Sequence, residues 1–237
     1  MEYSTSQRSV AEFIGSFALT FIGAGSVITV GGILGGDPID LLAIAIAHGL
    51  VLGIFVTALG HVSGAHFNPA VTLGVLVTRR ISGGMAVAYW IAQFTGGVAA
   101  AACLRVVFDD RIADPAGGVS LGAPALGPNT NVGEGFVLEI IMTFFLVFVV
   151  FATAIDPKGA FKFVGGFAIG LTIGVDIIVG GPLTGAAMNP QRAFGPQLLS
   201  GEWSNGWIYY VAPAIGGVLA ALVYHHIFLR GRNDDPA

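Results

Sequence analysis

The stretch HVSGAHFNPAVTLG (residues 61–74) decides the fold of this 237-residue chain, and a similar stretch, GPLTGAAMNPQRAFG, follows at 181–195. Each is polar at its centre and interrupts long apolar runs. The apolar segments that begin at the two Asn-Pro pairs, 68–78 and 189–199, are about half as long as the roughly 20 helical residues needed to cross a bilayer. Since neither can cross alone, we expect two loops that dip into a membrane and carry half-helices.

The composition indicates an integral membrane protein. Hydrophobic residues make up 54% of the chain, charged residues only 10%, and the mean hydropathy is +0.82, which leaves too little polar surface for a water-soluble domain. The lipid bilayer is therefore the first expected partner, and a net charge of −4 without a basic block argues against nucleic acid. The single cysteine, Cys103, excludes an internal disulfide and is expected to be a small buried filler.

Six apolar segments are long enough to span the membrane as helices. They are 9–31, 41–62, 84–108, 133–155, 160–182 and 206–229. Their apolar runs are continuous, whereas a membrane barrel would show alternating segments of about ten residues. The sequence therefore predicts an all-α membrane protein with six spans and two re-entrant half-helices.

The distribution of charged residues predicts the orientation. The lysines and arginines expected on the side of both termini are Arg8, Arg79, Arg80, Lys158, Lys162, Arg230 and Arg232. The opposite loops hold Asp37, Asp40, Asp109, Asp110 and Asp114, with Arg111 as an exception. Trp203, Trp207, Tyr209 and Tyr210 are expected to form an outer aromatic belt. Because basic residues favour the cytoplasmic side, we expect a multi-pass protein of the cell membrane with both termini in the cytoplasm.

The two halves of the chain resemble each other. VAEFIGSFALTFIGAG (10–25) matches VLEIIMTFFLVFVVFA (137–152), and each half holds one intramembrane glutamate before its Asn-Pro pair. We expect a single domain over 1–237, with repeat one at 9–108 and repeat two at 133–229. Because each repeat has three spans, the second enters the membrane from the opposite face, which makes an inverted repeat.

The Asn-Pro pairs predict how the half-helices begin. Proline is harmless in the first turn of a helix, so Pro69 and Pro190 should start the half-helices with Asn68 and Asn189 as their caps. Inverted symmetry then brings both helix N-termini, which carry positive partial charge, to the bilayer centre. A cation there meets positive potential from two sides.

Paired half-helices with Asn-Pro-Ala at 68–70 and an arginine after the second motif resemble the aquaporin or major intrinsic protein family, in its prokaryotic type. The resemblance covers nearly the whole chain. It implies the aquaporin fold, one narrow water pore per subunit that excludes ions and protons, usually a homotetramer, and no cofactor. It also implies that Asn68 and Asn189 bond the oxygen of the permeating molecule. The second motif departs from the family because position 191 is Gln191. We expect its amide to point away from the lumen and bond backbone carbonyls, but an altered midplane stays open.

Counting from the two asparagines, as the resemblance allows, places a four-residue selectivity filter at His48, Ile177, Ala186 and Arg192. This combination is similar to that of plant tonoplast aquaporins. It implies an opening that passes water and admits ammonia, hydrogen peroxide or urea as a further hypothesis. Glycerol-conducting members usually carry aspartate where this chain has Ala193, which favours water.

Other polar residues in the spans are expected to support the loops. The resemblance implies that Glu12 and Glu139 accept hydrogen bonds from the loops and hold the half-helices. His66, like His61, flanks the first loop and could orient it or line the cytoplasmic vestibule. Asp176 lies one residue before Ile177, and no partner for it can be named. The loop at 109–132 could cover the outer mouth.

Two alternatives to a water channel stay open. One is a glycerol or metalloid facilitator of the same architecture. The other is a coupled secondary transporter, because inverted repeats with broken helices occur there too. Central paired acids for ion coupling are missing from the sequence, which argues against the transporter. An enzyme is not expected, since no nucleophile, base and orienting acid converge and no metal-ligand spacing occurs.

Overall fold

The structure is a computed structural model that describes residues 3–34, 40–108, 119–159 and 164–231. All its regular elements within these ranges are helical. They are α1 (Thr5–Val27), α2 (Asp40–Ser63), α3 (Pro69–Val77), α4 (Gly83–Val107), α6 (Val132–Val150), α7 (Gly165–Thr184), α8 (Pro190–Ser200) and α9 (Ile208–Tyr224). Short π-helical segments, Ile28–Ile33, Phe151–Ile155 and His225–Leu229, continue α1, α6 and α9, and Ser120–Gly122 forms a 3₁₀ turn.

Six of these helices, with their π-helical extensions, are long and apolar enough to cross a membrane. The predicted fold class is confirmed, and the bounds differ mainly at two ends. The first span begins at Thr5, before the predicted residue 9, because Ser4 and Gln7 form a capping box that the apolar pattern does not reveal. The fifth runs over Gly165–Thr184. Residues 160–163 of its predicted range lie outside the described residues.

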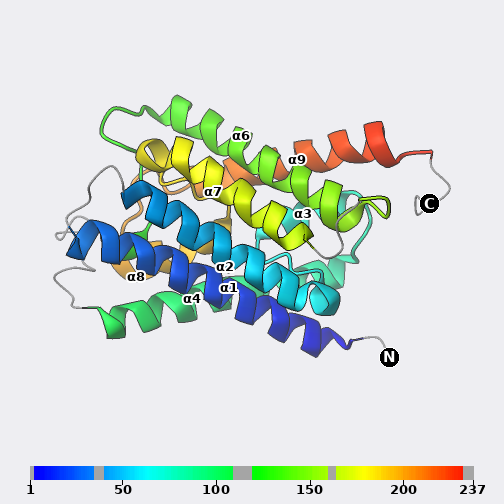
Figure 1. Cartoon of the computed structure of the whole chain (residues 1–237), viewed down its shortest axis with the longest axis horizontal. Coiled ribbons are helices and arrows are strands. Elements are labelled where there is room, and N and C mark those ends of the chain that lie inside the picture. Colours follow the sequence, from blue (N-terminus) through cyan, green and yellow to red (C-terminus); the bar gives the residue numbers. More distant parts are fainter. Residues whose placement is uncertain (1–2, 35–39, 109–118, 160–163, 232–237) are drawn as a thin grey trace.

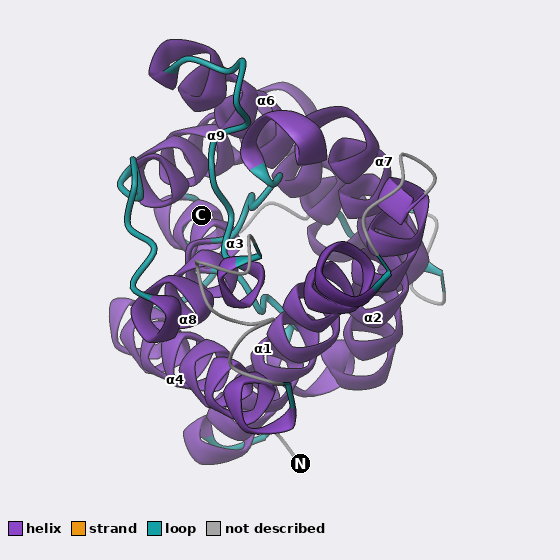
Figure 2. Cartoon of the chain, turned by 90° about the vertical axis from the view of Figure 1, so that its left-hand side faces the viewer, coloured by secondary structure: helices purple, strands orange, loops and turns teal. Residues whose placement is uncertain are grey.

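The helices are arranged as the inverted repeat requires. In repeat one α1 packs against α4, in repeat two α6 packs against α9, and α2 and α7 form the main contact between the repeats. The long helices surround α3 and α8, as the end-on view in Figure 2 shows for α3. Both chain termini lie at one end of the molecule (Figure 1). The half-helices α3 and α8 lie toward opposite ends of the molecule (Figure 1), and the residues before them are hydrogen-bonded to each other near the middle.

Glycines allow α2 and α7 to pack with their backbones in close contact. A Cβ atom added to Gly49 would lie 2.8 Å from the carbonyl oxygen of Gly170. Gly53 faces Gly166 in the same way, with 3.1 Å to its carbonyl oxygen. Small residues at this spacing are typical of membrane helix interfaces, where association depends on close van der Waals packing. The seam fixes one wall of the space between the repeats.

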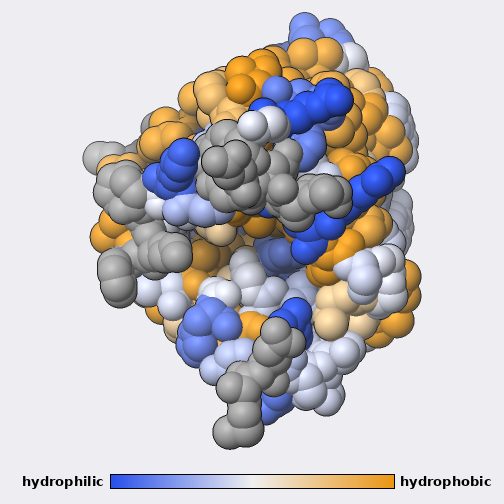
Figure 3. Space-filling view, turned by 90° about the vertical axis from the view of Figure 1, so that its right-hand side faces the viewer, coloured by the Kyte–Doolittle hydropathy of each residue, from blue (hydrophilic) through white to orange (hydrophobic). Residues whose placement is uncertain are grey.

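Several strongly hydrophilic residues gather on the end with both termini, and hydrophobic residues make up much of its rim (Figure 3). Arg8, Arg80, Lys158 and Arg230 belong to the helix ends and turns on this side. Further charged residues that bear on the predicted orientation lie outside the described ranges; they are Asp37, Asp109, Asp110, Arg111, Asp114, Lys162 and Arg232. Residues 109–118 of the loop at 109–132, which is expected to cover the mouth, lie outside them as well.

Two expectations about burial are wrong. Cys103 is exposed on α4 instead of filling a core position. Tyr209 is fully buried and donates from its hydroxyl to the carbonyl oxygen of Thr184 at 2.9 Å, so it does not belong to an interfacial belt. Trp203 and Trp207 are 45% and 51% exposed, as a belt requires. The reason is that a uniformly apolar helix does not show in its sequence which face turns inward.

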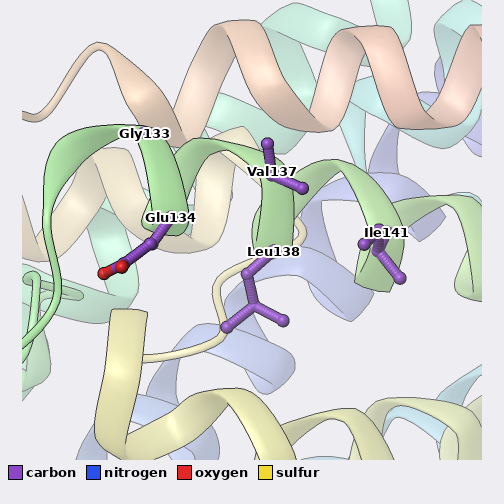
Figure 4. A pocket seen from close by; sticks show the side chains of 5 residues that line it. All are labelled: Gly133, Glu134, Val137, Leu138 and Ile141. Atoms are coloured by element: carbon purple, nitrogen blue, oxygen red, sulfur yellow. The ribbon is translucent and has the colours of Figure 1, made fainter.

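The outer flank of α6 carries a shallow surface pocket (Figure 4). It is lined by Gly133, Glu134, Val137, Leu138 and Ile141. All but Glu134, which lies in the first turn of the helix, are apolar. This mostly apolar surface suits contact with lipid chains.

Candidate functional site

The two loops before the half-helices share an unusual backbone. Ala65 and Phe67 have φ values of 50° and 47°, and the equivalent Ala186 and Met188 have φ values of 44° and 50°. Left-handed conformations cost a non-glycine residue about 1–2 kcal/mol, so they persist only where the surroundings hold them. The same strain at the same two positions before each asparagine indicates a functional constraint on both loops.

Glu12 on α1 holds the first loop. One oxygen, Oε1, accepts from the Ser63 hydroxyl at 2.7 Å and from the His66 backbone N–H at 2.9 Å. The other, Oε2, accepts from the Phe67 backbone N–H at 2.8 Å. The carboxyl group is completely buried, and these donors compensate for its removal from water.

Glu139 on α6 holds the second loop by equivalent bonds. Its Oε1 accepts from the Thr184 hydroxyl at 2.7 Å and from the Ala187 N–H at 2.9 Å, and its Oε2 accepts from the Met188 N–H at 2.8 Å. It is as fully buried as Glu12. The two carboxyl groups thus support the strained loops from within each repeat.

The two asparagines meet at the tips of the half-helices. Each caps its own helix: Oδ1 of Asn68 accepts from the Ala70 N–H at 2.8 Å, and Oδ1 of Asn189 accepts from the Gln191 N–H at 3.2 Å. Pro69 and Pro190 occupy the first helical turn. The caps leave both side-chain NH₂ groups free to bond elsewhere.

Those NH₂ groups cross to the opposite loop. Nδ2 of Asn68 donates to the Met188 carbonyl oxygen at 2.9 Å, and Nδ2 of Asn189 donates to the Phe67 carbonyl oxygen at 2.8 Å. An amide nitrogen carries two hydrogens, so one on each asparagine remains available. The tips are therefore tied together while keeping two donors for a third molecule.

Both asparagines line a narrow space that we call the central cavity. Its lining is Leu19, Leu52, Val56, Ala65, His66, Asn68, Val71, Leu146, Val150, Ile169, Ile173 and Asn189. The side chains are apolar except for His66 and the two asparagines. The cavity volume is about 10 Å³, which corresponds to about one water molecule. A permeating molecule would find few polar partners here.

A second space, the mouth cavity, lies toward the end opposite the termini. Its lining is Val27, Leu41, Ile44, His48, Gly122, Ala123, Pro124, Ile177, Gly181, Gly185 and Arg192. Its volume is about 120 Å³. Three of the four residues predicted for the filter thus share one cavity. The fourth, Ala186, is 3% exposed and does not belong to this lining.

Arg192 is held in the wall of the mouth cavity from two sides. Its Nη1 donates to the Gly122 carbonyl oxygen at 2.8 Å, while Nη2 and Nε lie 3.3 and 3.4 Å from Nε2 of His48. Nδ1 of His48 lies 2.9 Å from the Ile44 carbonyl oxygen, which can only accept. Nδ1 therefore carries the hydrogen, and Nε2 accepts from the guanidinium.

His66 is set in a polar chain on the other side of the asparagines. Nε2 of Gln93 donates to Oε2 of Glu12 at 2.8 Å and to Oγ1 of Thr72 at 2.9 Å. Oγ1 of Thr72 in turn lies within hydrogen-bond distance of Nδ1 of His66, 3.0 Å away. The ring also packs edge-on against Tyr89.

Three residues that support the loops or contact Arg192 could not be predicted from the sequence. Gln93 gave no signal because it is a single polar residue in an apolar helix. Tyr89, whose hydroxyl donates to the Ser63 carbonyl oxygen at 2.6 Å, was hidden in the same way. Gly122 acts through its backbone carbonyl, which every residue has, so no sequence pattern could identify it.

Three polar residues noted in the sequence, Gln191, Asp176 and His61, line neither the central cavity nor the mouth cavity. Gln191 is fully buried and bonded within the protein. Asp176 is 7% exposed, and its Oδ2 has no hydrogen-bond partner among the described residues. His61 lies at the surface in an edge-on contact with the Tyr3 ring.

Comparison with known proteins gives consistent results. A family model described as Major intrinsic protein matches residues 1–224. The chain is 45% identical over 224 residues to a probable aquaporin TIP-type alpha of Phaseolus vulgaris, covering 93% of this chain and 84% of that protein. It is 41% identical over 232 residues to aquaporin TIP4-4 of Zea mays, covering 96% and 88%. An aquaglyceroporin structure from Plasmodium falciparum superposes with a TM-score of 0.86 at 24% identity, over 95% and 98% of the two chains, which shows a shared fold.

Proposed function

This chain belongs to the major intrinsic protein family and is a water channel of the aquaporin type; we propose that water crosses it in single file between the tips of the two half-helices. The single observation that carries this route is the central cavity, in which Asn68 and Asn189 supply the polar groups at the seam of the repeats. Its apolar walls offer passing water few competing bonds. Permeation is passive, because the route needs no coupled ion.

The water molecule between the asparagines is oriented by them. Each asparagine keeps one N–H for this purpose, and an N–H group can bond only the oxygen of water. The hydrogens of that water then point along the pore in both directions. Such an arrangement interrupts the chain of water molecules through which a proton would pass.

Ions are excluded by positive charge along the same route. The N-termini of α3 and α8 face the midplane and carry positive partial charge. Arg192 adds a full positive charge in the wall of the mouth cavity. A cation meets both barriers, while an anion would have to leave its water shell to enter the narrow central cavity.

We assign the filter to His48, Ile177, Ala186 and Arg192. His48 and Arg192 present polar groups and Ile177 an apolar one on the mouth cavity, which suits ammonia, hydrogen peroxide or urea as additional small neutral solutes. Glycerol is disfavoured because Ala193, where glycerol-conducting relatives are expected to carry aspartate, is buried beside Tyr209. The support residues are Glu12, Glu139 and His66.

The proposal includes the cellular setting. We place the chain in the cell membrane as a single domain with repeats at 9–108 and 133–229. Both termini lie in the cytoplasm, because the basic residues of the described helix ends gather on their side. The exposed apolar flanks of one subunit fit lipid and three further copies in a homotetramer. We assign it transport only, without enzymatic activity.

Water flux through reconstituted protein tests the proposal. Proteoliposomes and protein-free vesicles are subjected to the same osmotic step in a stopped-flow instrument, at several temperatures and with or without an ion gradient. Fast shrinkage with a weak temperature dependence and no response to the gradient is expected. Shrinkage no faster than that of protein-free vesicles would refute a water channel, and flux that requires the gradient would instead indicate a coupled transporter. Parallel runs with ammonia, hydrogen peroxide, urea and glycerol decide the solute range.

A further inference from the structure

Gln191 differs from its counterpart in repeat one, Ala70. Both the nitrogen and the oxygen of its side-chain amide form hydrogen bonds inside the protein. Its Nε2 donates to the Phe67 carbonyl oxygen at 3.2 Å, and its Oε1 accepts from the Thr20 hydroxyl at 3.1 Å. The side chain is completely buried and lies outside both cavity linings. It therefore links α1 to the tip of the first loop without contacting the permeating molecule.

The carbonyl that Gln191 contacts is the one that Asn189 uses. Nδ2 of Asn189 donates to the Phe67 oxygen at 2.8 Å, so two N–H donors occupy its two lone pairs. The reciprocal carbonyl, that of Met188, accepts a side-chain N–H from Asn68 alone among the described residues. The two asparagines are thus held unequally, and the second has the additional support.

The surroundings of Gln191 match its side chain. Thr20 lies eight residues after Glu12, and the position eight residues after Glu139 in the other repeat is Val147. The polar pair of Thr20 and Gln191 therefore stands where the repeat symmetry places an apolar pair, Val147 and Ala70. Thr20 and Val147 are both fully buried. The two polar residues stabilise each other, because either polar group alone would be buried without its hydrogen-bond partner.

Space for the longer side chain comes from α4. A Cβ atom added to Gly97 would lie 2.5 Å from Oε1 of Gln191 and 2.6 Å from its carbonyl oxygen. Glycine is thus required beside Gln191. Gly97 on α4, the Thr20 hydroxyl and the Phe67 carbonyl together define one conformation of the Gln191 amide.

We propose that Gln191 is a positioning residue for Asn189, acting through the shared Phe67 carbonyl and anchored to α1 by Thr20. The inference rests on the proposed function and deepens it. A Phe67 carbonyl held from two directions cannot turn, so the Asn189 amide keeps one N–H on it and the other on the central cavity. Water at the midplane then meets a donor of fixed direction.

The first test separates hydrogen bonding from packing. Q191M keeps about the same length and removes the amide, T20V removes the hydroxyl with little change in shape, and T143V is the matched control. Thr143 is also fully buried in a span, but among the described residues its hydroxyl donates only to the Glu139 backbone carbonyl. Each variant is reconstituted at equal protein content after its elution volume and thermal midpoint are measured, and osmotic water flux is recorded at several temperatures.

We expect Q191M and T20V each to reduce water flux per protein by roughly two- to tenfold, the effect of one lost hydrogen bond on a transport barrier, and to steepen its temperature dependence. T143V should conduct like the wild type. If the wild type conducts water and Q191M conducts it equally well, the positioning role is wrong and the water channel stands. If the wild type itself conducts no water, the proposed function fails first.

The second test combines the two positions in one protein and compares the double variant with the single variants T20V and Q191A. T20V/Q191A gives positions 20 and 191 the residue types found at the symmetry-equivalent positions, Val147 and Ala70. If Thr20 acts on Asn189 only by anchoring Gln191, the double variant should conduct within about twofold of Q191A alone, because the Thr20 hydroxyl has no further effect once the amide is gone. Losses that simply multiply in the double variant would contradict the pair. Because T20V alone removes one bond on α1, the test does not depend on whether Q191M folds.

Discussion

Nη1 of Arg192 lies 2.8 Å from the carbonyl oxygen of Gly122, which joins the second half-helix to a turn 70 residues earlier in the chain. The same guanidinium faces Nε2 of His48. The charge of Arg192 is thus fixed beside the mouth cavity by groups from two other parts of the chain. Its position depends on the assembled bundle, and the first two predictions concern the groups that form this wall.

Replacing Arg192 by valine should remove the positive charge of the mouth. Water flux is expected to stay within about threefold of the wild type, while cation or proton conductance and urea flux should rise, because one of the two barriers to charge is lost. Planar-bilayer conductance and vesicle pH dyes measure this. R230V, at the exposed end near the C-terminus, is the control and should remain ion-tight. An R192V protein as ion-tight as the wild type would show that the half-helix dipoles suffice.

Replacing His48 by phenylalanine should narrow the mouth and remove the acceptor that faces Arg192. Ammonia flux is expected to fall by more than water flux, since a polar contact and free volume are lost together. The ratio of the two fluxes, measured by stopped flow on the same vesicles, is the readout. H226F on the exposed π-helical end after α9 is the matched control. Equal losses of both fluxes in H48F would remove His48 from the filter.

Replacing Glu139 by glutamine should destabilise the second loop. Glutamine has one acceptor oxygen and places an NH₂ group against N–H or O–H donors that the carboxylate satisfied, at about 1–3 kcal/mol for each unpaired buried group. A lower thermal midpoint in detergent and reduced water flux are expected. E134Q is the control, because this glutamate lies at the exposed start of α6, where glutamine can maintain the capping box with Asn131. An unchanged midpoint in E139Q would argue against a supporting role.

Replacing Gly49 by alanine should force α2 and α7 apart. The new Cβ atom would lie 2.8 Å from the Gly170 carbonyl oxygen, and overpacking of this kind costs about 1–3 kcal/mol. Gly60 on the same helix has open space around it, so G60A should be neutral or slightly stabilising. Thermal unfolding of the two variants side by side is the measurement. A G49A protein as stable as G60A would mean that the helices can separate freely at this point.

The sequence by itself determined the membrane class, the six spans, the half-helices and the inverted repeat. These features are local: a span shows in continuous apolar length, and a half-helix shows in Asn-Pro before a short apolar segment. The candidate pore residues Asn68, Asn189 and Arg192 could be named for the same reason, because their motifs are contiguous. The paired carboxylates, Glu12 and Glu139, also stood out as charges inside apolar runs.

Only the tertiary structure decided which face of each helix turns inward. Lipid chains are as apolar as leucine, so the hydropathy of a span does not distinguish its buried face from its lipid face. Cys103 therefore turned out exposed and Tyr209 buried, against expectation. The Gly122 carbonyl on Arg192, the Gln93 amide on Glu12 and the link from Thr20 through Gln191 to Phe67 join distant segments. Such contacts are set by packing in three dimensions, and a backbone carbonyl carries no mark in the sequence.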